Sequence, residues 1–118
     1  MKKIIFYSYL KCSTCSKAAK WLKSKDVEFQ LIDIVKEPPL VNYLNLALEQ
    51  YPNDKKRIFN TRGKAFKTLN IDIYCLSREE IIQLLLSDGK LIKRPFLIYE
   101  RKKVILGFNE NEYAKQFI

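Results

Sequence analysis

Two cysteines lie close together near the start of the chain, in the sequence Cys12-Ser13-Thr14-Cys15. They directly follow a short apolar run, at a point where we expect a helix to begin. The free N–H groups and the dipole of a helix N-terminus favour a thiolate, and Lys11 and Lys17 add positive charge nearby. We therefore expect Cys12 to be the nucleophile and Cys15, one turn further on, to be the resolving thiol that closes a disulfide with it. The alternative is two unrelated cysteines, one exposed and one in the core.

Two arginines are candidates for binding an anion beside these thiols. Arg94 precedes Pro95, which stands directly before an expected strand. A guanidinium is planar and permanently charged, so Arg94 could hold an oxyanion or stabilise a thiolate. Arg62 stands at the start of a short expected helix, where it either faces the same cleft or is an ordinary surface residue. The Arg94–Pro95 bond is either a trans bond at the start of a strand or a cis bond.

The remaining reactive residue types exclude several kinds of chemistry. The sequence contains no histidine, which removes Ser-His-Asp and Cys-His catalysis and histidine-based metal sites. Its three cysteines cannot complete a four-cysteine zinc site within one chain, so a structural zinc would need a carboxylate ligand or a dimer. We expect no metal and no organic cofactor. The third, Cys75, lies in the apolar sequence Ile73-Tyr74-Cys75-Leu76, and we interpret it as a small core residue.

The elements around the cysteine pair form a βαβ pattern. An apolar strand is expected over Ile4–Tyr7, a helix from the cysteine pair to about Lys25, and a second strand over Phe29–Ile34. Because a helix connects them, the two strands should be parallel. A cysteine pair of this spacing within a βαβ unit is typical of a thioredoxin-like redox motif.

The second half of the chain predicts a helical block followed by a hairpin. Pro38 and Pro39 open a helix, residues 62–69 form a short one, and a capping box at Ser77–Glu80 begins a third. Strands are expected at Phe96–Tyr99 and Lys103–Leu106, with a last helix from Asn109 to Phe117. We therefore predict an α/β, thioredoxin-like fold: a mixed four-stranded sheet with helices on both faces and an inserted helical subdomain. The single domain of residues 1–118 would have its core at about 1–36 and 90–118 and the insertion at about 37–89.

The chain of 118 residues is 47% hydrophobic and carries a formal charge of +9, with seven lysines and no acidic residue in positions 1–25. Such an excess of positive charge could bind nucleic acid, an acidic protein surface or an oxyanion. The alternative is that the lysine side chains simply lie in solvent. No nucleic-acid recognition motif or stacking platform is visible, so we do not expect direct nucleic-acid binding. No apolar segment approaches the length of a membrane helix, and the N-terminus lacks a signal-peptide cleavage site. We expect a cytoplasmic protein with no membrane contact.

Four segments together resemble the arsenate reductase (ArsC)/Spx family. They are residues 9–15 around the cysteine pair, residues 59–62, residues 91–95 with the Arg-Pro pair, and residues 106–110 before the last helix. They span nearly the whole chain in the family's order. The resemblance implies a thioredoxin-like core with a helical insertion, a cis Pro95 beside the redox cysteine, and thioredoxin or glutaredoxin as the reductant.

The family contains proteins of two functions, and this sequence matches residues typical of each. Arsenate reductases of the family use one cysteine and three arginines; Cys12 and Arg94 match, whereas Asn60 falls at the middle arginine position and Gly107 near the late one. Spx-type regulators carry a CxxC switch and bind the C-terminal domain of the RNA polymerase α subunit; Cys12, Cys15, Arg62 and Arg94 fit them. We predict a thiol-disulfide redox protein that reduces arsenate poorly, with a redox-sensing transcription regulator as the alternative.

Overall fold

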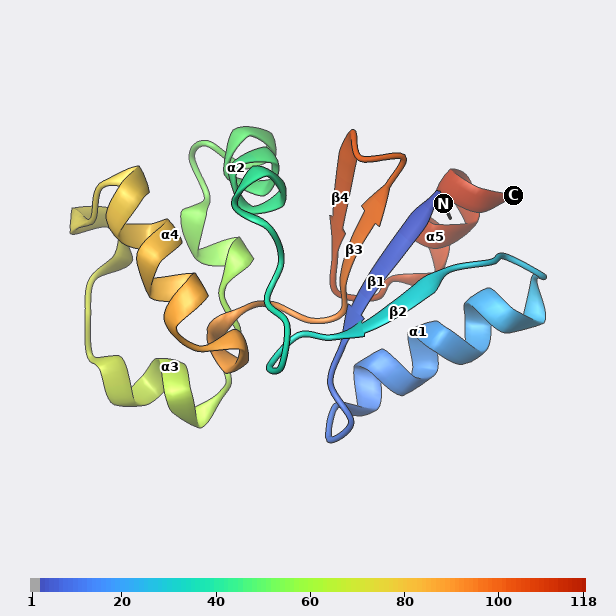
Figure 1. The fold of residues 1–118 in the computed structure, drawn as a ribbon, viewed down its shortest axis with the longest axis horizontal. Helices are drawn as coiled ribbons and strands as arrows, with labels where there is room; N and C mark the ends of the chain where they lie inside the picture. Colours follow the sequence, from blue (N-terminus) through green and yellow to red (C-terminus); the bar gives the residue numbers. More distant parts are fainter. Residues whose placement is uncertain (1–2) are drawn as a thin grey trace.

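The computed structural model describes residues 3–118 and contains one four-stranded sheet (Figure 1). The strands are β1 (Ile4–Ser8), β2 (Gln30–Asp33), β3 (Phe96–Tyr99) and β4 (Lys103–Leu106), in the order β2-β1-β3-β4. β1 is parallel to β2 and antiparallel to β3, and β3 is antiparallel to β4. The predicted mixed sheet is therefore confirmed, and the β3–β4 pair is the expected hairpin.

One face of the sheet is covered by α1 (Ser13–Ser24) and α5 (Glu110–Phe117). Side chains alternate between the faces of a strand, and on β1 the residues that face these helices are Ile4 and Phe6. They pack with Ala18 and Leu22 of α1 and with the fully buried Tyr113 of α5 in one apolar cluster. The spacing of Ala18 and Leu22 places both on one helix face, as the sequence predicts.

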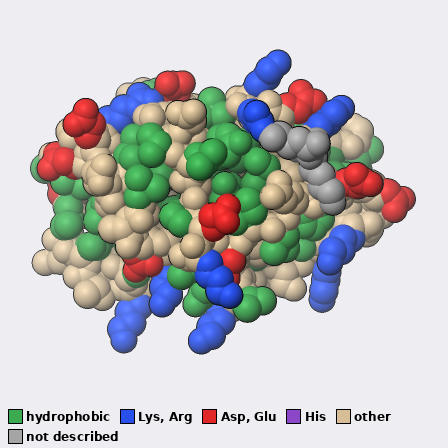
Figure 2. Space-filling view, in the orientation of Figure 1, with side chains coloured by type: hydrophobic (Ala, Val, Ile, Leu, Met, Phe, Trp, Pro, Cys, Tyr) green, Lys and Arg blue, Asp and Glu red, His purple; other side chains and the backbone are tan. Residues whose placement is uncertain are grey.

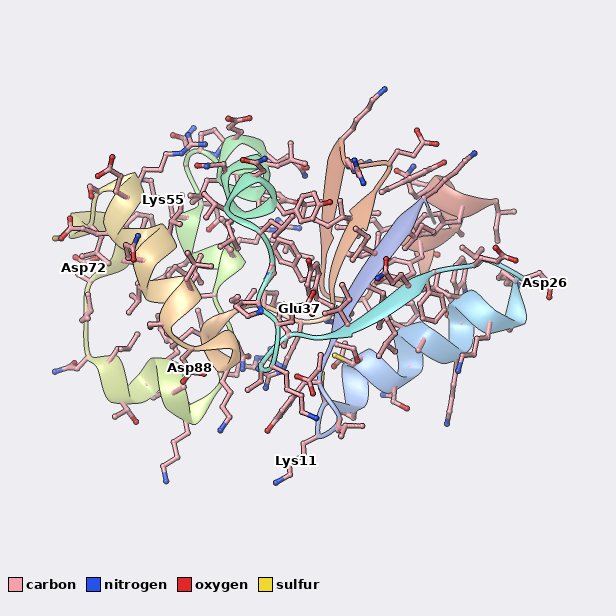
Figure 3. All side chains as sticks on the ribbon, viewed as in Figure 1. Lys11, Asp26, Glu37, Lys55, Asp72 and Asp88 are labelled. Carbon is pink, nitrogen blue, oxygen red and sulfur yellow. The ribbon has the colours of Figure 1, made fainter. Side chains whose placement is uncertain are left out.

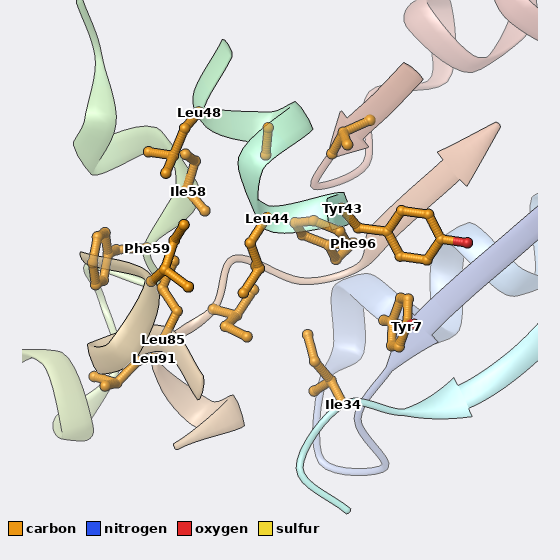
Figure 4. Packing of buried hydrophobic residues seen from close by; sticks show 14 of the residues in the cluster. Tyr7, Ile34, Tyr43, Leu44, Leu48, Ile58, Phe59, Leu85, Leu91 and Phe96 are labelled. Carbon is orange, nitrogen blue, oxygen red and sulfur yellow. The ribbon is translucent and has the colours of Figure 1, made fainter. Parts of the chain in front are cut away.

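The other face of the sheet meets the helical segment, which forms the left half of Figure 1. It consists of α2 (Val41–Gln50), α3 (Lys64–Leu69) and α4 (Arg78–Ser87), joined by short 3₁₀ helices. The second apolar cluster runs without a break from Tyr7 and Phe96 of the sheet through Leu44 into this segment (Figure 4). The 3₁₀ helices were not predicted; they lie at Lys55–Ile58, Ile73–Cys75 and Gly89–Leu91.

Two contacts join the helical segment to the sheet. Gly89 is buried so closely against the backbone of Ile34 and Val35 that a Cβ atom at residue 89 would overlap the carbonyl oxygen of Ile34. The side chain of Gln50, at the end of α2, donates to the carbonyl oxygen of Val104 (2.8 Å) and accepts from its N–H (2.6 Å). The helical segment is thus held at the carboxyl end of β2 and at the outer edge of β4.

The helix ends follow the predicted capping residues. Ser77 and Glu80 form both hydrogen bonds of a capping box at the start of α4, and Asn109 accepts from the N–H of Glu112 at the start of α5. The expected core includes residues 1 and 2, which lie outside the described residues. No helix between residues 3 and 118 is long and apolar enough to cross a membrane.

The interpretation of Cys75 as a core residue is wrong. Its side chain is exposed, and its thiol lies 3.5 Å from a carboxylate oxygen of Asp72. The apolar pattern around it is explained by Ile73, which is fully buried, and by Leu76, which is partly buried against the same cluster, while Tyr74 is 54% exposed. The segment is a 3₁₀ helix, capped by Asp72, that presents one residue to the core and its neighbours to solvent.

Candidate redox site

The cysteine pair lies at the start of α1, where Cys12 is the N-cap residue. The Cys12 backbone is extended, and its sulfur accepts a hydrogen bond from the N–H of Cys15 over 3.2 Å. Cys12 is half-buried, whereas Cys15 is buried with 1% of its surface exposed. Both are free thiols here. The helix therefore presents one sulfur toward solvent and a hydrogen-bond donor toward that sulfur, and it keeps the second sulfur behind them.

The two thiols have different electrostatic surroundings. Burial, and next the hydrogen bond with Cys12, raise the pKa of the Cys15 thiol to about 12. A buried thiol resists ionisation because its charged form loses hydration. Cys15 therefore keeps its proton at neutral pH and does not compete with Cys12 for an external substrate.

Arg94 and Pro95 lie at the entry to β3. The Arg94–Pro95 peptide bond is cis, Pro95 is buried, and its carbonyl oxygen accepts from the N–H of Gly107 (2.9 Å). The Arg94 guanidinium lies 4.9 Å from the ring centre of Tyr9 and donates to the carbonyl oxygen of Lys90 over 3.1 Å. Its Nε atom is buried and has no hydrogen-bond partner among the described residues. Arg94 is thus partly anchored, with donor groups left for a ligand.

A cleft of about 490 Å³ opens beside Cys12, and its charged lining is mostly basic. The three residues expected from the sequence to bind an anion or the thiolate all line it together with Cys12, namely Lys11, Arg62 and Arg94. Cys15 and Pro95 lie behind this lining rather than in it. The other charged side chains are Arg57, Lys93 and Glu112, so five cations face one carboxylate. A disulfide or oxyanion with negative charge nearby suits this cleft.

Arg57 and Lys93 are the functional candidates that sequence reasoning missed. Arg57 belongs to the unpredicted 3₁₀ helix Lys55–Ile58, where its guanidinium lies 4.7 Å from the ring centre of Tyr51. Lys93 lies next to Arg94 in the sequence, and this adjacency was the one available signal. Its side chain also fills the space beside Gly107, where a Cβ atom would meet Lys93 Cε at 3.2 Å. Gly107 has a φ of +72°, a backbone conformation that disfavours any larger residue at this position. The side chain of Lys93 therefore supplies a cation near the expected late arginine position, where residue 107 itself cannot.

Backbone hydrogen bonds bring the two cationic segments together. The N–H of Asn60 donates to the carbonyl oxygen of Leu91 (2.8 Å), and the N–H of Lys93 donates to that of Ile58 (2.7 Å). Phe59 and Ile92 pair between them as an isolated antiparallel bridge. The basic wall formed by Arg57 and Arg62 is therefore fixed to Lys93 and Arg94, although more than thirty positions separate the segments in the sequence.

No cluster of three or more His, Cys, Asp or Glu side chains that could hold a metal ion occurs within residues 3–118. The cleft's own groups are thiols, guanidinium and ammonium groups, amides and one carboxylate. These groups suit thiol exchange on a substrate held by positive charge.

Comparison with known proteins decides the family. The model of the ArsC family matches residues 7–116. The chain belongs to the ArsC family. Among curated proteins it is 40% identical to the uncharacterized protein YusI of Bacillus subtilis, covering 97% of this chain and 98% of the relative. It is 33% identical to the regulatory protein MgsR of the same organism (97% and 90%) and 34% identical to the global transcriptional regulator Spx of Lactiplantibacillus plantarum (95% and 84%).

Solved structures agree with this membership. A possible arsenate reductase from Streptococcus mutans superposes with a TM-score of 0.90 at 36% identity, covering 99% of this chain and all of that one. A putative ArsC family related protein from Bacteroides fragilis gives 0.85 at 36% identity, with 96% of each chain covered. The predicted ArsC/Spx resemblance is therefore confirmed. Within the ArsC family the matched relatives include both regulators and arsenate reductase-like proteins, so membership leaves the specific activity open.

Proposed function

We propose that this protein is a thiol-disulfide redox protein in which Cys12 attacks the substrate and Cys15 resolves the adduct. The observation that carries the proposal is the arrangement of the pair at the start of α1. Cys12 is accessible and receives a hydrogen bond at its sulfur, and Cys15 is buried, protonated and one helical turn away. This division suits two successive attacks by different sulfurs.

In the first step the Cys12 thiolate attacks one sulfur of a substrate disulfide. A Cys12–substrate disulfide forms, the substrate S–S bond breaks, and the departing thiolate takes a proton from water. The N–H of Cys15, already directed at the Cys12 sulfur, stabilises the thiolate before attack. Arg94, with Lys11 and Arg62, holds anionic groups of the substrate against the cleft wall.

In the second step Cys15 attacks the sulfur of Cys12. The Cys12–Cys15 disulfide forms and the second substrate thiol leaves, carrying the proton that Cys15 gives up. Two thiols are thus oxidised while one disulfide is reduced to two thiols. Thioredoxin or glutaredoxin would then restore the dithiol by the same exchange in reverse.

The test is to follow the redox state of the cysteines during turnover. The protein is mixed with bis(2-hydroxyethyl) disulfide, and alkylation with mass spectrometry should find a Cys12–Cys15 disulfide, with Cys75 outside it and alkylated as a free thiol. NADPH consumption is then measured with the thioredoxin and glutaredoxin systems as separate donors, and with arsenate in place of the disulfide. Absence of the Cys12–Cys15 disulfide would refute the mechanism. Arsenate reduced faster than the disulfide would replace it with an arsenate reductase.

The second candidate is a redox-sensing transcription regulator. It is favoured by the likeness to MgsR and Spx, which extends over 97% and 95% of this chain. The proposed partner is the C-terminal domain of the RNA polymerase α subunit. A pull-down with that domain, before and after oxidation of the cysteine pair, separates the candidates: a regulator is retained in one redox state, whereas a redox enzyme is retained in neither.

A further inference from the structure

The positive charge of the cleft continues onto the surrounding surface. Ser13 lines the cleft, and Lys17 and Lys20 follow it along the same stripe of α1 at positions i+4 and i+7. Lys64 comes two residues after Arg62, and Lys90 supplies the carbonyl oxygen that Arg94 binds. We call the exposed lysines around the cleft mouth the basic rim: Lys11, Lys17, Lys20, Lys64 and Lys90.

This charge is not neutralised within the molecule. The ion pairs found among residues 3–118 are Lys3–Glu100 and Arg78–Glu49, and neither involves the basic rim. In Figure 2 Lys and Arg side chains project along the lower edge of the molecule, where Figure 3 places Lys11 and Figure 1 places α1 and α3. α1 itself contains no acidic residue. An uncompensated basic surface around a reactive thiol attracts a negatively charged partner and speeds its encounter.

Leu10 indicates what kind of partner this is. It lies beside Lys11 at the cleft mouth and is 94% exposed, more than any other large hydrophobic residue that the structure describes. An isolated apolar side chain within a charged rim suits contact with a protein surface, because protein interfaces combine apolar contacts with charged surroundings. Nucleic acid would favour exposed aromatic rings for base stacking. The exposed large aromatic residue among those described is Tyr74, which lies beyond α3 and outside the rim.

We propose that the basic rim and Leu10 form the docking surface for an acidic protein that carries the disulfide exchanged at Cys12. This inference rests on the proposed redox function and names its substrate class: a protein disulfide flanked by Asp and Glu. The partner's carboxylates face the rim lysines, and the disulfide enters the cleft toward Cys12. The exchange is the two-step reaction already described, with the partner's disulfide as the electron acceptor.

The probes are three short cysteine peptides, each held as a disulfide with 2-mercaptoethanol. The residues flanking the cysteine are Glu in the first, Lys in the second and Ser in the third. At low ionic strength we expect the Glu peptide to react with Cys12 at least about tenfold faster than the Ser peptide, and the Lys peptide to react more slowly than both. Added salt should remove the advantage of the Glu peptide.

The variant Lys17→Glu/Lys20→Glu reverses two rim charges outside the cleft lining. In this variant the Glu peptide should react little faster than the Ser peptide. Because the two rates are compared within one variant, any change in the reactivity of Cys12 itself cancels from their ratio. The matched control is Lys102→Glu/Lys103→Glu, which makes the same change of charge at the far end of the β3–β4 hairpin and should keep the ratio. Circular dichroism verifies that both variants are folded.

The outcomes separate the two proposals. If the Ser peptide yields neither an adduct at Cys12 nor a Cys12–Cys15 disulfide, the redox function itself fails. If all three peptides react at the same rate, or the control variant loses the ratio as the rim variant does, the docking surface fails while the redox function stands. A single-stranded oligonucleotide that binds the protein, loses binding in the rim variant and competes with no peptide would assign the rim to nucleic acid and overturn the proposal.

Discussion

The sheet with α1 and α5 and the helical segment from α2 to α4 contribute different things to one site. The first region supplies both sulfurs, placed by local sequence: a short turn follows β1, and Cys12 then caps the N-terminus of α1. The second region supplies Arg57 and Arg62, placed by hydrogen bonds to residues 91–93. The proposed thiol chemistry is thus encoded locally, whereas the positive charge proposed to select a substrate depends on the packing of two distant segments.

The largest effect is expected from the sulfurs. In a Cys75→Ser background, which removes the exposed third thiol, Cys12→Ser should abolish adduct and disulfide formation, because the remaining Cys15 is buried and protonated. Cys15→Ser should leave the first attack intact and trap the Cys12–substrate disulfide. Intact-mass measurement after reaction with bis(2-hydroxyethyl) disulfide distinguishes the two variants. An adduct on Cys15 in the Cys12→Ser variant would reverse the assigned roles.

The close contact between Gly89 and Ile34, which holds the helical segment against the sheet, is tested by Gly89→Ala. The new methyl group would overlap the backbone at Ile34, so α4 and β2 must move apart. We expect a loss of about 1–3 kcal/mol in the free energy of unfolding, measured by urea denaturation. Gly63→Ala is the control, because its Cβ atom would meet the movable side chain of Asn60. Equal losses in both variants would mean that this contact can adapt to the methyl group.

Arg94 is anchored by a hydrogen bond, whereas Arg57 is exposed, so the two arginines should contribute differently to stability. Arg94→Ala removes a hydrogen bond and the contact with Tyr9, so it should lower the free energy of unfolding by about 1–2 kcal/mol. From its position before a strand alone, Arg94 would be expected to contribute little to stability. Arg57→Ala removes an exposed contact with the Tyr51 ring and should lower the free energy of unfolding by less than about 1 kcal/mol.

Both arginine variants should slow the reaction with an acidic peptide disulfide, by up to about tenfold, because each removes one cation from the cleft wall. The reaction with a neutral disulfide is the control measurement. If Arg57→Ala leaves the acidic peptide's rate unchanged, the helical segment does not contribute to substrate selection.

Stability should fall in alkaline solution. The pKa of Cys15 is raised to about 12 from an ordinary value of 9.0, and that of Tyr7 to about 12 from 10.0, in both cases chiefly by burial. Between pH 9 and 12 the folded Cys15 keeps a proton that the unfolded chain releases, so the free energy of unfolding decreases as the pH rises. Each such group contributes at most about 1.4 kcal/mol per pH unit. Denaturation at pH 8 and 10, with Cys15→Ala as comparison, measures the cysteine's share; an equal slope in that variant would remove Cys15 as the cause.

The smallest effect is expected at Cys75. Its side chain is exposed and outside the cleft lining, so Cys75→Ser should change the free energy of unfolding by less than about 0.5 kcal/mol. Formation of the Cys12–Cys15 disulfide should be unaffected. Slower disulfide formation in this variant would give Cys75 a redox role that its position does not suggest.

The same division explains what the sequence could predict. β3, β4 and the capped start of α4 follow from apolar runs and a capping box, which are local signals, and the structure matches them. The lining of the cleft by Arg62 and Arg94 could be proposed from motif spacing. Arg57 could not, because a 3₁₀ helix has no strong periodic signal, and long-range backbone contacts with residues 91–93 bring that helix to the cleft. The exposure of Cys75 was missed because a short apolar run does not reveal which of its members faces inward.

The hydrogen bonds between Gln50 and Val104 bear on self-association. β4 is an edge strand, and an edge strand offers unpaired N–H and C=O groups on which another chain can add a strand. The Gln50 amide satisfies both groups of Val104, in the way that a neighbouring strand would. The residue that covers this edge of the sheet belongs to the helical segment and not to the sheet itself. Any local unfolding that releases α2 therefore exposes the β4 edge at Val104 for pairing with another chain, which would favour aggregation.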